Sequence, residues 1–291
     1  MPGTLRLVVI SGLSGSGKSV ALHMLEDLGY FCVDNLPAGL LNTFVSHLVR
    51  HPDGLHSRAA VGLDARNREA ELEAIPGLVR DLRQAAIDCD VLFLHADDDS
   101  LLRRFGDTRR RHPLARPGWS LREAIAEERR LLGPVNDAAD LVIDTTSTSV
   151  HQLRETIRLR VDARKTGRLS ILFESFGFKH RLPADVDFVF DARTLPNPYW
   201  DEKLRHLTGR DQPVIEFLDA QPAMAAYLDD IAGFIERRIP AYQEANRGYL
   251  TVAIGCTGGQ HRSVYLADRL AERFGARFPG VLARHTALEP R

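Results

Sequence analysis

The feature that most constrains this chain is a glycine-rich segment near its N-terminus. Gly12-Leu-Ser-Gly-Ser-Gly-Lys-Ser19 fits the pattern G-x-x-x-x-G-K-[ST]. The apolar run Leu5–Ile10 before it predicts a buried strand. After it, apolar residues recur at helical spacing from Ala21, and Gly29 predicts the end of that helix. Strand, loop and helix in this order predict a phosphate-binding loop in an α/β domain.

The residue types in this loop suit a bound nucleoside triphosphate. Glycines let consecutive backbone N–H groups turn inward without a Cβ clash, and the helix that follows adds its positive end. The Lys18 ammonium is expected to reach the β- and γ-phosphates, and the Ser19 hydroxyl to ligate Mg²⁺. The predicted phosphate-binding residues are Gly12, Leu13, Ser14, Gly15, Ser16, Gly17, Lys18 and Ser19.

A Mg²⁺ site next to this loop needs a carboxylate from a neighbouring strand end. Asp64, which closes the segment AAVGLD, is the first choice, and with Ser19 it forms the predicted metal site. Asp34 and Asp97 are competing choices, and each of the three aspartates also fits a helix N-cap. Lys18, Ser19 and Asp64 are therefore the predicted catalytic residues.

Arginines are dense between Arg103 and Arg116. Enzymes that transfer phosphoryl groups to small molecules often carry such arginines on a helical lid, where they stabilise the transferring charge. A solvated basic face paired with nearby aspartates explains the same residues. No Asn-Lys-x-Asp segment that would read guanine is present, so the residues leave adenine and guanine open.

Alternating strands and helices predict an α/β fold with two domains over the 291 residues. The expected strands of the first domain, after the opening one, are Arg58–Leu63, Val91–Leu94 and Leu141–Ile143, with helices over 68–88 and 123–132 between them. Residues 151–168 are expected to form a helix that leads into a connector. The expected strands of the second domain are Leu169–Phe173, Phe188–Phe190, Val214–Phe217 and Leu250–Ile254. The predicted division is a kinase-like P-loop domain with a parallel sheet over 1–152, a connector over 153–168 and a smaller α/β domain over 169–291.

A second glycine-rich turn follows the last of these strands. Cys256-Thr-Gly-Gly-Gln-His-Arg262-Ser263 leads into a helical pattern, so its N–H groups and Arg262 predict an anion-binding site. Cys256 and Arg262 also have the C-x₅-R spacing of a cysteine phosphatase loop, although no general acid can be assigned, and a structural turn is the third alternative. Lys179 and His180 could face the same ligand. The candidate ligand residues are His180, Cys256, Thr257, Gly258, Gly259, His261 and Arg262.

Charge is uneven along the chain. The formal net charge is −1, yet the segment from Asn246 to Arg291 holds seven arginines against three acids, a local excess of four positive charges. Such an excess suits a phosphate backbone, and Arg277 and Arg284 are the candidate RNA-binding residues. A solvated helix face with a frayed tail explains the same pattern.

The remaining composition argues for a cytoplasmic protein. No apolar run approaches the roughly 18 residues that cross a bilayer, and the N-terminus lacks the features of a signal peptide. The three cysteines give neither a disulfide framework nor a zinc spacing. We therefore expect no membrane partner.

Six segments together resemble one family. GLSGSGKSVAL, EDLGYFCVDNLP, DTRRRHPL, FESFGFKH, DARTLPNPYW and VAIGCTGGQHRSVYLA occur here in the order typical of the RapZ/YvcJ family of bacterial P-loop nucleotide-binding proteins. The resemblance implies ATP and GTP binding with slow hydrolysis, and it matches Asp64, Ala65, Arg66 and Asn67 to the family's GTP-binding motif. In the members that act as RNase adapters, the C-terminal domain binds small regulatory RNA and senses an amino-sugar phosphate. Those members are homo-oligomers that deliver the RNA to an endoribonuclease.

Three functions follow as hypotheses. The first is a regulatory nucleotide-binding protein with ATPase and GTPase activity, whose C-terminal domain binds a phosphorylated metabolite or RNA. The second is an RNA adapter in which nucleotide turnover is incidental. The third is a small-molecule kinase that uses the arginine-dense segment as its lid.

Overall fold

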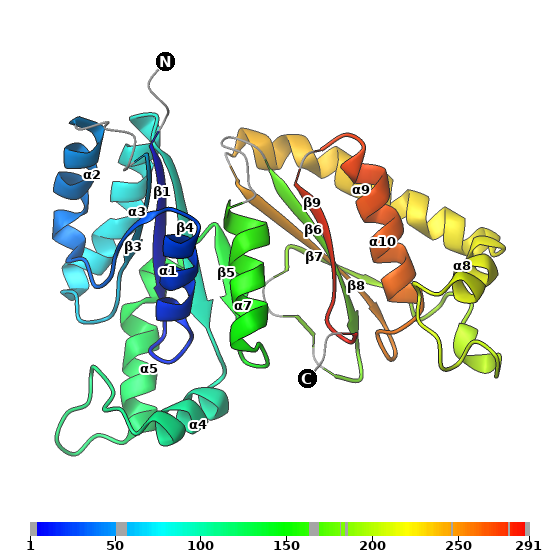
Figure 1. Cartoon of the computed structure of the whole chain (residues 1–291), viewed down its shortest axis with the longest axis horizontal. Helices are drawn as coiled ribbons and strands as arrows, with labels where there is room; N and C mark the ends of the chain where they lie inside the picture. The colour runs from blue at the N-terminus through cyan, green and yellow to red at the C-terminus, as the bar shows by residue number, and fades with distance from the viewer. Residues whose placement is uncertain are drawn as a thin grey trace. The chain divides into compact units, whose positions relative to one another are not determined.

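The computed structural model describes residues 5–50, 57–162, 169–180, 182–183, 186–245, 247–278 and 280–288. The chain divides into two compact units, Met1–Thr166 and Gly167–Arg291, and each has its own hydrophobic core (Figure 1). None of the helices among these residues is both long and apolar enough to cross a membrane.

The first unit is built on a parallel sheet, as predicted. Its strands, in the described part of the unit, follow the order β2-β3-β1-β4-β5, and every neighbouring pair is parallel. The bounds are β1 Arg6–Gly12, β2 Phe31–Val33, β3 Arg58–Gly62, β4 Asp88–His95 and β5 Leu141–Asp144. Since β1 lies in the centre, the loop that follows it emerges at the middle of the sheet's carboxyl edge, where α/β proteins bind ligands.

Helices cover this sheet on both faces. Figure 1 shows α1 and α7 together on the near side, and these two helices contact each other. On the far face, alternate strand residues such as Leu7 and Val9 join the core with α2, α3 and α6. The bounds are α1 Lys18–Asp27, α2 Leu41–Arg50, α3 Glu69–Gln84, α4 Asp98–Thr108, α5 Leu121–Leu131, α6 Gly133–Asp137 and α7 Val150–Ile157, with short turns at Ala38–Leu40 and Arg158–Asp162.

Glycine is sterically required where β1 meets the P-loop. A Cβ built on Gly12 would lie 2.1 Å from the Leu94 carbonyl oxygen of β4, and its φ is 145°. At Gly17, φ is 105° and a Cβ would lie 2.7 Å from a methyl carbon of Leu153. A side chain at position 12 would collide with the backbone of β4, and at position 17 the positive φ strains any residue other than glycine.

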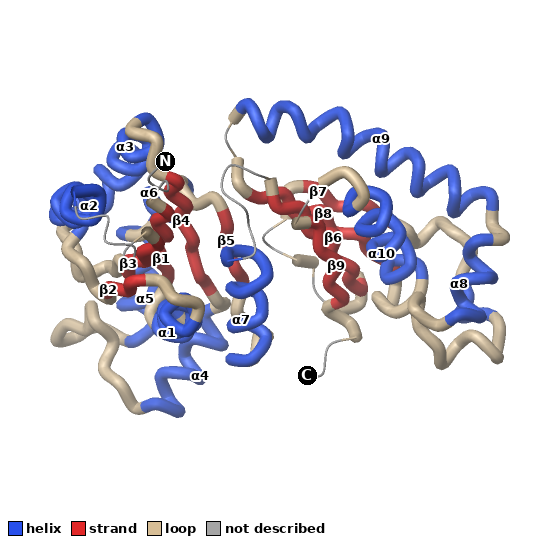
Figure 2. Tube along the Cα trace, turned by 45° about the horizontal axis from the view of Figure 1, so that its top comes forward, coloured by secondary structure: helices blue, strands red, loops and turns tan. Residues whose placement is uncertain are grey.

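The second unit repeats the α/β design with fewer strands. Its described strands follow the order β7-β8-β6-β9, all parallel. Figure 2 shows the long helix α9 running alongside this sheet. The bounds are β6 Ser170–Gly177, β7 Phe188–Asp191, β8 Tyr249–Cys256, β9 Val281–His285, α8 Gln212–Asp219, α9 Pro222–Glu244 and α10 Arg262–Gly275, with a 3₁₀ turn at Pro198–Trp200.

One predicted element has the wrong type. The segment Val214–Phe217, predicted as a strand, lies within α8. Val214 and Leu218, four residues apart, are its buried positions, as expected on one face of a helix, and Pro213 stands at the start, where helices accept proline. A four-residue segment with three apolar residues is too short for periodicity to decide between helix and strand.

Several predicted bounds also differ from the structure. The helix predicted over 68–88 ends at Gln84, and Asp88 already belongs to β4. The short strands β2 and β9 were not predicted, and β9 occupies the stretch read as a basic tail. Residues 163–168 of the predicted connector lie outside the described residues.

Candidate nucleotide-binding site and a second glycine-rich loop

Neighbouring elements hold the P-loop by its carbonyl groups. The Gly15 carbonyl accepts a hydrogen bond from Arg104 Nη1 at 2.9 Å, and the Ser16 carbonyl accepts one from Thr145 Oγ1 at 2.9 Å. Thr145 Oγ1 also lies 3.0 Å from the carbonyl of His95 at the end of β4. Since these carbonyls are satisfied by the protein, the loop can turn its N–H groups to the opposite side.

Helix α1 begins without a side-chain cap. Gly17 occupies its N-cap position, whereas α4, α5 and α7 are capped by Asp97, Ser120 and Ser149. Within the described part of the chain, the amides at the start of α1, those of Lys18 and Ser19, donate to no other protein group. Unpaired amides at the positive end of a helix are suited to bind an anion.

Acidic side chains from three different segments act on the Lys18 ammonium. Its Nζ donates to the Gly12 carbonyl at 2.6 Å. Burial lowers the pKa of Lys18 below its ordinary value, while Glu128, Asp64 and Asp34 act in the opposite direction. The loop thus presents a partly desolvated cation among carboxylates, an arrangement suited to a phosphate group with its metal ion.

Asp64 to Asn67, the segment matched to the GTP-binding motif, forms a closed turn. The buried Asp64 carboxylate accepts hydrogen bonds from the Arg66 amide at 3.0 Å and from Arg66 Nε and Nη2 at 2.8 and 2.6 Å. Asn67 Nδ2 donates to the Asp64 carbonyl, and its Oδ1 accepts from the Ala38 amide at 2.6 Å. Ala65 is buried within the turn.

The three aspartates considered for Mg²⁺ have different surroundings. Asp97 caps α4 by accepting from the Ser100 amide at 2.8 Å, and Asp64 is engaged by Arg66 as above. Asp34 is exposed, and its Oδ1 lies over Gly62 at the end of β3, 2.6 Å from where a Cβ would stand. The carboxyl edge of the sheet therefore carries one exposed aspartate and one engaged aspartate near Lys18.

The residues present fit a magnesium ion held together with phosphate. Magnesium prefers oxygen ligands and is usually bound through one or two carboxylates together with phosphate oxygens and water. The exposed Ser19 hydroxyl at the start of α1, with Asp34 and Asp64, offers oxygens of this kind. In the described residues, no group of three His, Cys, Asp or Glu side chains could hold a metal ion alone.

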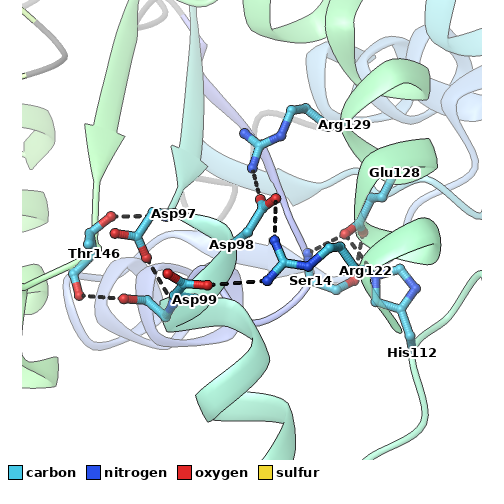
Figure 3. Close-up of polar contacts among 10 residues, drawn as sticks. Ser14, Asp97, Asp98, Asp99, His112, Arg122, Glu128, Arg129 and Thr146 are labelled. Carbon is cyan, nitrogen blue, oxygen red and sulfur yellow. Dashed lines mark hydrogen bonds and ion pairs between the residues drawn. The ribbon is translucent and has the colours of Figure 1, made fainter. Parts of the chain in front are cut away.

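A buried carboxylate on α5 contacts the P-loop directly (Figure 3). Glu128 is fully buried; its Oε2 accepts from the Ser14 amide at 2.8 Å and its Oε1 from Ser14 Oγ at 2.7 Å. His112 Nε2 lies 3.2 Å from Oε2, and the Leu114 amide donates to His112 Nδ1 at 3.1 Å. With Nδ1 accepting, the proton of the neutral ring resides on Nε2, so His112 donates to Glu128.

Sequence reasoning missed both Glu128 and His112. Glu128 stands in a predicted helix that is rich in charged residues, where nothing sets it apart from Glu127. His112 stands in DTRRRHPL, one of the segments that carried the resemblance, and that segment was the available signal.

The arginine-dense segment lies close to the P-loop. Arg104, from α4, is one of the groups that hold the loop's carbonyls. Figure 3 shows the neighbouring arginines of α5 turned to the aspartates at the start of α4: Arg129 pairs with Asp98 at 2.8 Å, and Arg122 with Asp99 at 3.3 Å. These pairs tie α5 to α4.

In the second unit, the predicted ligand residues surround the end of β8. Lys179 donates its amide to the Thr257 carbonyl at 3.2 Å, and its Nζ would lie 3.8 Å from a Cβ on Gly258. Lys179 and His180 are exposed beside this turn. The structure thus brings together the two segments of this unit that the sequence singled out.

The candidate RNA-binding arginines lie elsewhere in this unit. Arg277, just past the end of α10, is exposed and pairs with Glu236 of α9 at 2.6 Å. Arg284 is part of β9, where it lies opposite Glu174 of β6.

The parallel sheet, the glycine loop after its central strand and the uncapped helix define a P-loop nucleotide-binding protein. Models of the RapZ-like N-terminal domain and the RapZ C-terminal domain match residues 5–165 and 169–289. The chain therefore belongs to the RapZ family, which confirms the resemblance drawn from the sequence.

Full-length relatives agree. Nucleotide-binding proteins of Alkalilimnicola ehrlichii and Marinobacter nauticus are 52% and 48% identical over 285 residues, which is 98% of this chain and 99% and 97% of theirs.

Among solved structures, a shikimate kinase from Acinetobacter baumannii is 16% identical with a TM-score of 0.36, covering 56% of this chain and 96% of that one. A sugar kinase from Janibacter is 19% identical with a TM-score of 0.35, covering 54% and 95%.

Proposed function

We propose that this protein is a regulator that binds ATP or GTP with Mg²⁺ in its first unit and hydrolyses the nucleotide slowly. The observation that carries the proposal is the uncapped start of α1, where the amides of Lys18 and Ser19 donate to no other group in the described part of the chain. Gly12 to Ser19 hold the phosphates, and Lys18 neutralises their charge. Slow turnover fits a site where Glu128 and Asp64, two of the carboxylates that act on Lys18, are already hydrogen-bonded.

The metal ion provides the direct test of this site. We expect Asp34→Asn to raise the Mg²⁺ concentration needed for half-maximal ATP hydrolysis by about tenfold, because it removes an exposed carboxylate next to Lys18. Asp64→Asn should weaken nucleotide binding itself, since it also breaks the pair with Arg66. The measurements are Mg²⁺ titrations of phosphate release and calorimetry with ATP and GTP.

The matched control is Asp97→Asn. Asparagine caps helices as well as aspartate does, so this variant should behave like the parent protein. An Mg²⁺ requirement that shifts more in the Asp97 variant than in the other two would contradict the assignment. No heat with either nucleotide at millimolar concentrations would remove the proposal.

The second unit is proposed to bind a phosphorylated ligand. The turn after β8 leads into α10, which also starts without a side-chain cap and has the buried Arg262 at its first position, and the exposed Lys179 contacts the turn at Thr257 and Gly258. A sugar phosphate is the ligand class that the family resemblance implies. The same resemblance supports a cytoplasmic homo-oligomer that acts with an endoribonuclease.

RNA is the second candidate ligand, favoured by three arginines at four-residue spacing, Arg269, Arg273 and Arg277, along α10 and just past its end. Each forms an exposed ion pair, and such pairs are weak enough for RNA phosphates to replace them. We expect affinity for a small RNA to fall by about tenfold or more between roughly 50 and 200 mM salt. Arg277→Glu should lower affinity and flatten the salt dependence, while Arg80→Glu on α3 of the first unit should not. Affinity that does not change with salt would exclude this candidate.

A further inference from the structure

The turn after β8 surrounds a thiol with hydrogen-bond donors. We call Cys256–Ser263 the thiol loop. Cys256 Sγ accepts from the Gly259 amide at 3.2 Å and lies 3.2 Å from Ser263 Oγ. The amides of His261 and Ser263 also point to it. Donors converging on sulfur stabilise a thiolate more than a thiol.

The pKa of Cys256 is shifted in the opposite direction to those of the other two cysteines. Burial acts to raise the pKa of Cys256, but the hydrogen bonds from Ser263, Gly259 and His261 outweigh it and hold the pKa below the ordinary thiol value. Burial raises the pKa of Cys32 to about 11 and that of Cys89 to about 12. Cys256 is thus the cysteine whose surroundings favour the nucleophilic form.

A buried arginine with one unpaired nitrogen lies against Cys256. Arg262 is only 4% exposed, and its Nη1 donates to the carbonyls of Arg193 and Leu195 at 2.8 and 2.9 Å. Its Nε is buried and has no hydrogen-bond partner among the described residues, while the guanidinium interacts with Cys256. A buried donor without a partner is costly, so this edge is suited to a ligand oxygen.

We propose that Cys256 is the nucleophile of a phosphoryl-transfer site in the second unit, with Arg262 and the loop amides holding the phosphate oxygens. Sγ attacks phosphorus of a phosphate monoester, the S–P bond forms, and the P–O bond to the leaving group breaks with its electron pair on oxygen. Water then attacks phosphorus, the S–P bond breaks, the electron pair returns to Sγ, and inorganic phosphate leaves with the water oxygen. Ser263 Oγ, hydrogen-bonded to Sγ, stabilises the departing thiolate.

The neighbouring acid limits the class of substrate. Asp191 ends β7 next to the thiol loop, but it accepts hydrogen bonds from the Arg193 amide, Nε and Nη2, and these bonds lower its pKa. An ionised Asp191 cannot donate a proton to the leaving oxygen. The substrates proposed here are aryl and acyl phosphates, because their leaving groups depart as stable anions and need no proton from Asp191.

The experiment uses the full-length protein with p-nitrophenyl phosphate and no nucleotide. We expect release of p-nitrophenolate that falls by about a hundredfold or more in Cys256→Ser and in Arg262→Lys, and that persists in Lys18→Ala, which disables the P-loop. Cys32→Ser is the matched thiol control and should retain full activity. Ser263→Ala should keep the initial burst but slow steady turnover, because the thiolate leaves less readily.

A second measurement does not depend on variants that could misfold. The rate of alkylation by iodoacetate, plotted against pH, should have its inflection at a lower pH for Cys256 than for Cys32. Inorganic phosphate should protect Cys256 from alkylation. Samples quenched with acid during turnover should carry phosphorus on Cys256.

This proposal deepens, and rests on, the phosphate-binding role proposed above for the second unit, and the two can fail separately. Phosphate protection of Cys256 without p-nitrophenolate release or a phosphocysteine overturns the nucleophile and leaves the binding role standing. An absence of protection together with an absence of release overturns both.

Discussion

Replacing Lys18 with alanine is expected to lower the affinity for Mg²⁺·ATP and Mg²⁺·GTP by roughly a hundredfold, about 3 kcal/mol. The ammonium stands at the P-loop, partly desolvated, so its attraction for phosphate is screened less than on an open surface. Calorimetry gives the affinity, and phosphate release should fall in parallel.

The fold should survive this change. Lys18 donates to the Gly12 carbonyl, but burial already disfavours its charged form, so removing the ammonium costs little native-state stability. The urea midpoint should therefore stay close to that of the parent protein. Lys203→Ala, an exposed lysine of the second unit, is the matched control and should bind nucleotide normally. Equal affinity in the Lys18 and Lys203 variants would show that the loop does not bind the phosphates.

Replacing Glu128 with alanine should cost about 3–5 kcal/mol of the first unit's unfolding free energy. The change leaves the Ser14 amide, Ser14 Oγ and His112 Nε2 without their acceptor, and it opens a cavity under the P-loop. Urea unfolding followed by circular dichroism measures the loss.

Two further variants separate the loss of hydrogen bonds from the loss of side-chain volume as causes of the lower stability. Glu128→Gln keeps the volume but offers one acceptor oxygen to three donors, so it should lie between the parent and the alanine variant. Glu127→Ala, one residue earlier and paired with Arg130 near the surface, should change stability little. A Glu128→Ala protein as stable as Glu127→Ala would mean that the buried carboxylate does not support the loop.

The sequence was sufficient to predict the strand, glycine-rich loop and helix around Gly12–Ser19 because local rules determine this arrangement. Gly12, Gly17 and Lys18 stand at fixed spacing between a strand and a helix. Gly12 is explained by the adjoining strand β4 and Lys18 by its bond to the Gly12 carbonyl, while Gly17 has a positive φ and also faces Leu153 of the distant helix α7. The alternation of strands and helices likewise predicted the parallel sheet of the first unit, although the short strand β2 was missed.

The parts of the site and fold that could not be predicted depend on contacts between residues far apart in the sequence. Glu128 is 114 residues from Ser14, and nothing in its own helix distinguishes it from Glu127 before the fold brings it to the loop. The strand prediction for Val214–Phe217 was wrong because so short a segment fits a helix or a strand equally well until its neighbours are known. β9 is short and partly exposed, so its sequence carries a weak strand signal and its pairing with β6 defines it.

The closeness of Gly12 to Leu94 has a practical consequence for anyone designing an inactive version of this protein. Any side chain at position 12 would push β1 away from β4, so such a mutant loses its architecture together with its ligand, and a null phenotype could not be ascribed to either. A loss-of-binding allele that still yields an intact chain has to be made at Lys18, with Gly12 left unaltered.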